Sequence, residues 1–276
     1  MNVSEIVTQK IIDELEKGQI PWHKPWIGTH AIVSRGSGKP YSFINQMLIG
    51  RPGEYATFNQ ITQEGGRLNK GAKGSVVVFY KKQLVDEPGI PEDERRYIPV
   101  LRYYRVFNIE DTNLERKHRP EPITFNPIEE GERVAKEYLT REGIKLIHEY
   151  GNKACYNPAS DAITLPKPDQ FPEEEEYYST LFHEITHSTG VETRLNRRVA
   201  KEYHSNKETR SREELIAEIG AAAMNTYLGI SNEKSMRNST GYIQSWLTYL
   251  KNDTRAIISA SSLAEKSHNY VLGITE

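Results

Sequence analysis

The stretch Ser179-Thr-Leu-Phe-His183-Glu184-Ile-Thr-His187-Ser-Thr-Gly190 contains the pattern H-E-x-x-H. On a helix, residues four positions apart lie on one face, so the imidazoles of His183 and His187 can point at the same spot. Two imidazoles placed in this way can hold a zinc ion, and Glu184 can act as general base on a metal-bound water. Because such a short pattern also occurs by chance on ordinary helices, the surrounding sequence must decide.

The surrounding residues favour a helix with a buried side. An acidic run at residues 173–176 suits a helix N-terminus, where the helix dipole favours negative charge. Gly190 is a natural helix end. Four apolar residues then form a side that can be buried. They are Tyr178, Leu181, Phe182 and Ile185.

A second helix is predicted over residues 211–223, which are rich in Ala and Ile on one side. It carries Glu214 and Glu218, which are four positions apart and share a face. Carboxylates on a helix that is otherwise apolar need a partner, because an unpaired buried charge is costly. A metal ion with its histidines supplies that partner, and the alternative is a solvated acidic stripe. The upstream H-E-x-x-H favours the metal site.

Two helices with H-E-x-x-H and E-x-x-x-E resemble the active site of the gluzincin metallopeptidases. In that family the first acidic residue of the second helix is the third ligand, and the residue four later orients a ligand histidine. The resemblance implies that Glu214 is the ligand and Glu218 the orienting residue, around Zn²⁺ or another divalent ion such as Mn²⁺. The family usually has Asp at the later position, which leaves Glu218 and Glu213 open as the true ligand.

Composition narrows the class of protein. A chain of 276 residues with 37% hydrophobic and 27% charged residues fits a soluble globular protein of two modest domains. Its single cysteine, Cys155, excludes an internal disulfide framework and suits a reducing cytosol, so we expect a cytoplasmic protein. No apolar run approaches the length of a membrane span and the N-terminus does not resemble a signal peptide, so we expect no membrane partner.

Charge is distributed unevenly along the chain. Residues 1–120 hold 18 Lys and Arg against 14 Asp and Glu, a net charge of +4, whereas the remainder holds 18 against 24, a net charge of −6. This asymmetry places any anionic partner on the N-terminal half.

The N-terminal half contains aromatic and basic segments that suit single-stranded nucleic acid. In Pro21-Trp22-His-Lys-Pro25-Trp26, both tryptophans lie in a non-helical segment, where they can cover the core or stack on bases, and the sequence leaves both interpretations open. Two Gly-punctuated basic loops, at residues 34–41 and 67–74, can approach a phosphate backbone or be ordinary loops. Candidate contacts are Trp22, Trp26, Arg35, Lys39, Tyr41, Arg67, Lys70, Lys73 and Tyr103.

Short motifs in the same order resemble the ArdC antirestriction family over nearly the whole chain. They include Pro21-Trp22-x-x-Pro25-Trp26, Gly38-Lys-Pro-Tyr41, Lys70-Gly-x-Lys73-Gly74, Tyr104-Arg-Val-Phe-Asn108, Tyr156-Asn-Pro-Ala-Ser-Asp161, Arg194-Leu-Asn-Arg197 and Tyr242-Ile-x-x-Trp246-Leu247. In that family an N-terminal domain binds single-stranded DNA, a C-terminal domain is a zincin-like metallopeptidase, and members protect transferred DNA from host restriction.

The resemblance implies an α+β fold with two domains. We expect an α+β single-stranded-DNA-binding domain at residues 1–115, a linker at 116–130 and a gluzincin-type metallopeptidase domain at 131–276. The implied function is protection of incoming plasmid or phage DNA from host restriction, with single-stranded DNA as partner and a restriction enzyme as candidate protein substrate. The alternative is a DNA-shielding protein whose metal-binding half is structural. The presence of Glu184 favours retained chemistry, because a purely structural metal site would not need it.

Hydrophobic periodicity predicts the individual elements. In the first half we expect helices at residues 4–17, 42–50 and 57–65, strands at 75–81 and 97–107, and a polar loop at 86–96. In the second half a helix at 127–141, a strand at 144–148 and a hairpin at 154–165 precede the metal helix. Only helices, at 240–251 and 256–270, follow the two helices that carry the candidate metal ligands. In both halves the strands should be segregated from the helices.

Overall fold

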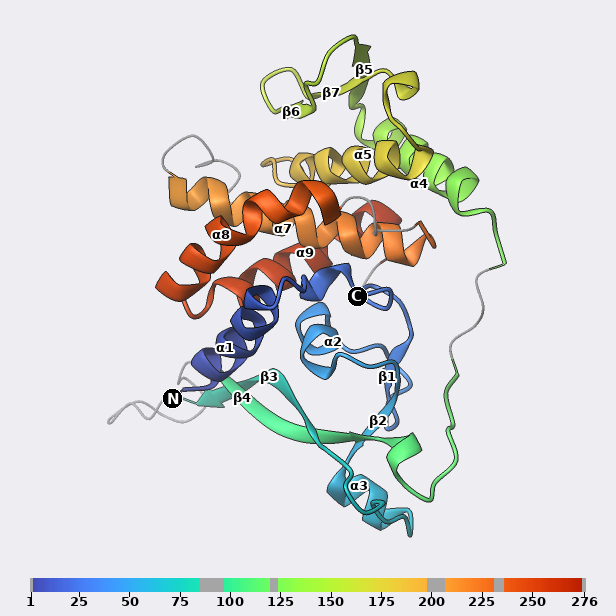
Figure 1. The fold of residues 1–276 in the computed structure, drawn as a ribbon, viewed down its shortest axis with the longest axis vertical. Coiled ribbons are helices and arrows are strands. Elements are labelled where there is room, and N and C mark those ends of the chain that lie inside the picture. The colour runs from blue at the N-terminus through green and yellow to red at the C-terminus, as the bar shows by residue number, and fades with distance from the viewer. Residues whose placement is uncertain (1, 85–96, 120–123, 198–206, 231–235, 275–276) are drawn as a thin grey trace.

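Two separate sheets lie at opposite ends of a layer of helices in the computed structural model, which describes residues 2–84, 97–119, 124–197, 207–230 and 236–274 (Figure 1). The first sheet has the order β1-β2-β4-β3, and the second has the order β5-β7-β6. The strands are β1 (Ile32–Ser34), β2 (Gly53–Thr57), β3 (Ser75–Leu84), β4 (Tyr97–Asn108), β5 (Lys145–Glu149), β6 (Cys155–Asn157) and β7 (Ala162–Pro166).

The helices follow the predicted positions within a few residues. They are α1 (Val3–Glu16), α2 (Phe43–Ile49), α3 (Phe58–Gln63), α4 (Pro127–Glu142), α5 (Glu174–Ser188), α7 (Lys207–Tyr227), α8 (Met236–Asn252) and α9 (Ala256–Leu272). Short 3-10 turns are η1 (Pro21–His23), η3 (Ile109–Asp111) and η4 (Pro168–Gln170). Side-chain caps define several starts: Asn2 and Glu5 form a capping box on α1, and Asn126 caps α4.

The long β3–β4 hairpin dominates the first sheet, and one side chain pairs with its outer edge at Val78. Asn45 of α2 donates from Nδ2 to the Val78 carbonyl at 2.9 Å and accepts the Val78 N–H at 2.7 Å. Neighbouring residues of β3 point to opposite faces, so Val77 and Val78 are buried in different cores. The predicted polar loop at residues 86–96 lies outside the described residues.

The second sheet precedes α5, and only helices follow it among the described residues, as expected. Two short parallel pairs were not anticipated: β1 with β2 in the first sheet, and β5 with β7 in the second. Strands β1 and β2 themselves were missed, because segments of three and five residues show little periodicity. Each sheet is therefore mixed. In the first half α2 and α3 alternate with the strands, so the predicted segregation of strands from helices is wrong there, but the α+β class still describes the chain.

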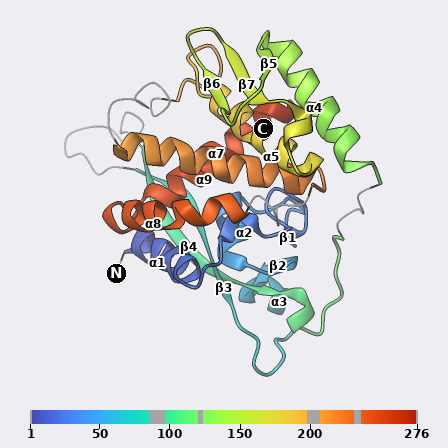
Figure 2. The ribbon, with the colours of Figure 1, turned by 45° about the horizontal axis from the view of Figure 1, so that its top comes forward.

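The largest hydrophobic core draws on both halves of the chain. Helix α1 packs beside α8 and helix α2 beside α9 (Figure 2). The first half contributes residues of α1, η1 and α2, and the second half contributes residues of α7, α8 and α9. At its centre the ring of Trp22 meets that of Trp246 edge-on, with centroids 5.0 Å apart. The predicted boundaries at residues 115 and 131 remain a prediction, but the main core crosses them.

Candidate metal centre

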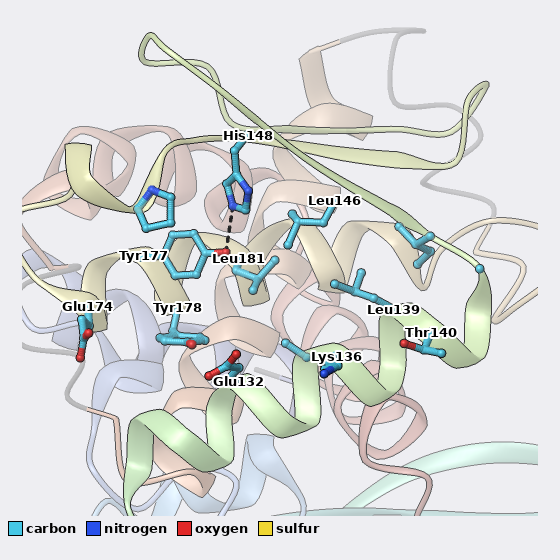
Figure 3. Close-up of a pocket in the computed structure, with 14 residues that line it drawn as sticks. Glu132, Lys136, Leu139, Thr140, Leu146, His148, Glu174, Tyr177, Tyr178 and Leu181 are labelled. Atoms are coloured by element: carbon cyan, nitrogen blue, oxygen red, sulfur yellow. Dashed lines mark hydrogen bonds between the residues drawn. The ribbon is translucent and has the colours of Figure 1, made fainter.

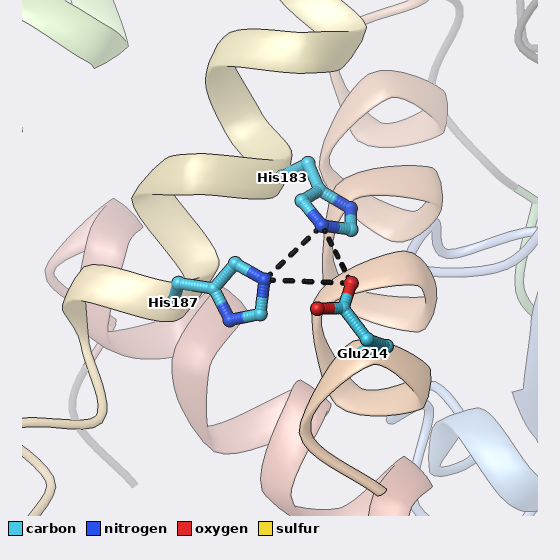
Figure 4. Close-up of side chains that lie close together, drawn as sticks. All are labelled: His183, His187 and Glu214. Atoms are coloured by element: carbon cyan, nitrogen blue, oxygen red, sulfur yellow. Dashed lines mark hydrogen bonds and ion pairs between the residues drawn. The ribbon is translucent and has the colours of Figure 1, made fainter. Parts of the chain in front are cut away.

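Helices α5 and α7 pack side by side and bring three predicted ligands together (Figure 4). The Nε2 atoms of His183 and His187 lie 3.1 Å apart. Glu214 places Oε2 at 3.3 Å from the first of these atoms and 3.7 Å from the second. One ligand atom from each residue falls within 4.8 Å of the others. Two imidazoles one turn apart on α5 and one carboxylate of α7 therefore face a common point.

The outward nitrogen of each imidazole faces a different carboxylate of α7. His187 Nδ1 lies 3.3 Å from Glu213 Oε1, and His183 Nδ1 lies 3.6 Å from Glu218 Oε1. A carboxylate on Nδ1 fixes the ring and leaves Nε2 as the metal donor, which is the usual outer arrangement of histidine sites. This donor set, two imidazole nitrogens and one carboxylate oxygen, fits a divalent ion of the zinc type.

Arg197, to which the sequence alone had assigned no role, holds Glu213 in place. Its buried guanidinium pairs with both oxygens of Glu213 and donates to the Thr186 carbonyl. The adjacent pair Glu213-Glu214 was the sequence signal for such a partner. Neighbouring helix residues point about 100° apart, so only one of the two carboxylates can face the histidines directly and the other needs a cation.

The histidines and carboxylates of the site shift one another's pKa values. Burial by itself would lower the pKa of both histidines, but the carboxylates outweigh it, so the pKa of His183 is raised and that of His187 rises to about 10. Burial likewise acts to raise the pKa of Glu214, yet the two histidines bring it well below its usual range. The cluster has an excess of carboxylates over fixed cations, and a divalent ion would balance that excess.

Glu184 lies beside the ligands and is oriented from the second sheet. Its side chain is buried, and its Oε2 accepts the backbone N–H of Tyr156 in β6 at 2.7 Å. Arg194 fastens the β6–β7 hairpin, because it pairs with Asp161 at 2.7 Å and with Glu142 of α4 at 3.0 Å. The edge strand β6 is thus held against α5, the helix that carries His183 and His187.

Two of the predicted nucleic-acid contacts are structural residues instead. Trp22 is fully buried, so its ring has no face for a base, and it fills the shared core. Arg35 is buried and pairs with Glu54 and Glu64 at 3.1 and 2.8 Å. It also donates to the Glu115 carbonyl at 2.8 Å, which fastens the end of the first half to its sheet. Both predictions are corrected by burial that local sequence does not reveal.

The remaining candidates are spread over the first half. Lys39, Arg67, Lys70, Lys73 and Tyr103 are exposed, and Trp26 and Tyr41 are half-buried. Trp26 and Tyr41 pack on the small core around Val77. Tyr104 lies opposite Val77 in the β3–β4 register, so it shares their face, whereas Tyr103 points to the other. Sequence reasoning did not include Tyr104 or its neighbour Phe79 among the candidate contacts.

A separate cavity of about 680 Å³ lies between α4, β5 and the first half of α5 (Figure 3). Leu139, Leu146 and Leu181 form an apolar floor, and the Tyr177 hydroxyl is 3.1 Å from His148 Nε2 at one side. Neither the three candidate ligands nor Glu184 line it.

In the described part of the chain, every helix is too short or too polar to cross a membrane.

Comparison with known proteins agrees with this geometry. Residues 1–107 match the family model of the N-terminal domain of anti-restriction factor ArdC, and residues 133–263 match a zincin-like metallopeptidase model. The Mn(II)-bound crystal structure of antirestriction ArdC protein from the R388 plasmid is 30% identical, with a TM-score of 0.76 over 99% of this chain and 98% of that one. The chain belongs to the ArdC antirestriction family. The metal-free structure of the same protein gives 28% identity and a TM-score of 0.77.

Curated relatives of this ArdC family member include two Escherichia coli proteins named DNA primase TraC, 31% and 29% identical over 99% of this chain. The chain spans only 20% and 27% of their lengths. An uncharacterized protein y4eC of Sinorhizobium fredii is 29% identical over 96% of this chain and 90% of its own length. The family resemblance and the two-part α+β fold predicted from sequence are confirmed by these matches.

Proposed function

We propose that this ArdC family member protects incoming plasmid or phage DNA from host restriction by binding single-stranded DNA with its first half and hydrolysing a protein with its second. The proposed peptidase activity rests on one observation: three candidate metal ligands converge beside Glu184, and they are His183, His187 and Glu214. We propose Zn²⁺ as the ion. The Mn(II)-bound structure of the R388 protein supports a divalent metal and makes Mn²⁺ the alternative.

The proposed chemistry assigns a task to each residue of the site. A divalent ion held by the two histidines and Glu214 would polarise a peptide carbonyl and make water more acidic. Glu184 accepts a proton from water and passes it to the leaving amine, and the Tyr156 N–H keeps its carboxylate aimed. Glu213 and Glu218 hold the imidazole rings. Strand β6, at the sheet edge beside Glu184, offers an extended peptide a place to lie.

Replacing the proton acceptor separates metal binding from hydrolysis. We expect Glu184→Gln to retain the metal and to lower hydrolysis by about 100-fold or more, because an amide cannot take a proton from water. The measurement is cleavage of a purified restriction endonuclease, and of casein as an unfolded probe, in the presence of Zn²⁺ or Mn²⁺. If the variant cleaves like the wild type, Glu184 is not the base. If the wild type cleaves nothing while both proteins protect DNA, the shielding function with a structural metal half is correct.

The proposed single-strand surface is the face of the β3–β4 hairpin that carries Phe79, Arg102 and Tyr104. The rings of Phe79 and Tyr104 lie 5.4 Å apart, and they are 41% and 37% exposed. Trp26 and Tyr41 extend the same face. Exposed rings next to an arginine can stack on bases, which a duplex hides within its own stack. The lysines Lys39, Lys70 and Lys73, together with Arg67, are proposed as phosphate contacts.

Two neighbouring tyrosines test which face of the hairpin binds. We expect Tyr104→Ala to weaken single-strand affinity by about 1–3 kcal/mol and Tyr103→Ala to leave it unchanged, since the two rings point to opposite faces. Fluorescence anisotropy with single-stranded and duplex oligonucleotides at two salt concentrations measures both. A loss confined to Tyr103→Ala would move the site to the opposite face. Equal wild-type affinity for single strands and duplex would refute the stacking model.

A further inference from the structure

One side chain from the first half reaches the metal centre of the second half. His23, in the 3-10 turn η1, places Nε2 at 3.9 Å from Glu218 Oε2, and its side chain is 4% exposed. The other oxygen of Glu218 lies 3.6 Å from His183 Nδ1. The carboxylate of Glu218 therefore bridges a histidine that is a candidate ligand and a histidine contributed by a segment 160 residues earlier in the chain.

The segment that carries His23 is packed tightly on α7 and α8. Trp22 is fully buried against Trp246. At the other end of the segment, Gly28 has a φ of +84°, and a Cβ there would lie 2.7 Å from the carbonyl oxygen of Ala223 in α7. These contacts fix the segment on both sides of His23, so the imidazole has little freedom to leave Glu218.

The burial of His23 is unfavourable if the residue serves only to fill space. Its Nδ1 is buried and has no hydrogen-bond partner within the described part of the chain. A polar ring buried with one nitrogen unsatisfied costs free energy that an apolar side chain of similar size would not. The contact with Glu218 is what distinguishes histidine from such a side chain at this position.

We infer that His23 is a positioning residue of the metal centre, which holds Glu218 so that Glu218 can hold His183. The inference rests on the metal site of the proposed function and extends that site across both halves of the chain. Each of the two imidazoles faces a different oxygen of Glu218. Without His23 the carboxylate loses one of the contacts that orient it, and the ring of His183 loses part of its alignment toward the ion.

Metal titration of the full-length protein tests this role. His23→Phe keeps a buried ring and removes the nitrogen that faces Glu218, and His23→Gln keeps a polar group there. His30→Phe, at an exposed histidine between η1 and β1, is the matched control. We expect His23→Phe to weaken Zn²⁺ affinity by roughly three- to tenfold, with His23→Gln near the wild type and His30→Phe unchanged. The visible absorption of bound Co²⁺, which reports ligand geometry, should change in His23→Phe alone.

Circular dichroism and thermal unfolding of the metal-free proteins establish that each variant is folded. A folded His23→Phe protein with wild-type affinity and Co²⁺ spectrum would overturn the inference and leave the proposed function standing. If His23→Phe does not fold, the smaller His23→Leu replaces it, and failure of both to fold would show a packing role and overturn the inference. A wild type that binds neither ion would overturn the proposed metal site and this role with it.

Discussion

His183→Ala is expected to lower the affinity for divalent metal by more than about 100-fold. This loss is larger than the one expected when a residue that only orients a ligand is removed, because His183 is itself a candidate ligand. The substitution removes one of two imidazoles and leaves one imidazole nitrogen and one carboxylate for the ion. It also removes one contact of Glu218, that between its Oε1 and His183 Nδ1. The first half should remain folded, because His183 belongs neither to the core that the two halves share nor to the two small clusters of the first half.

Elemental analysis after gel filtration measures the metal retained, and circular dichroism reports the fold. His148→Ala is a matched control, since this exposed histidine lies on β5 beside the separate cavity. It should keep the full metal content. Full metal content in the His183→Ala protein would show that the ion, if bound, lies elsewhere.

Trp22→Ala is expected to destabilise the whole chain by about 3–5 kcal/mol, the usual range for removing a fully buried large aromatic side chain. Trp22 is 0% exposed and lies edge-on to Trp246. The cavity would open in the core that α1 and α2 share with α7, α8 and α9. Because neither half can close that cavity alone, we expect both halves to lose stability together and to unfold in one transition.

Urea unfolding followed by circular dichroism, with limited proteolysis at intermediate concentrations, measures this effect. Tyr150→Ala, at a ring that is 75% exposed, should change stability by less than about 0.5 kcal/mol. A Trp22→Ala protein in which the second half keeps wild-type stability while the first half unfolds would show that the two halves fold independently. Such a result would support the predicted linker at residues 116–130 as a border between two domains.

Several features of this protein could be predicted from sequence because they depend on local periodicity. A helix repeats every 3.6 residues, so the spacing of His183 and His187 alone places both imidazoles on one face. The capped start of α4 and the turn between β6 and β7 are likewise set by neighbours a few residues away. The order of elements in the second half followed from such signals, whereas the family resemblance rested on short motifs in matching order.

Other features depend on contacts between distant segments, which only the tertiary structure decided. Glu213, Glu214 and Glu218 are all acceptable ligands by type, and the rotation of α7 against α5 determines that Glu214 faces the two Nε2 atoms. Trp22 and Trp26 occupy similar Pro-braced positions, yet only Trp22 is fully buried, because Trp246 packs against it from more than two hundred residues away. The charged partners of His23 and Arg35 are likewise distant in sequence, so the pairing at these positions is set only by the folded chain. Arg35 meets its partners within the first half, whereas His23 meets Glu218 only because the two halves close around one core.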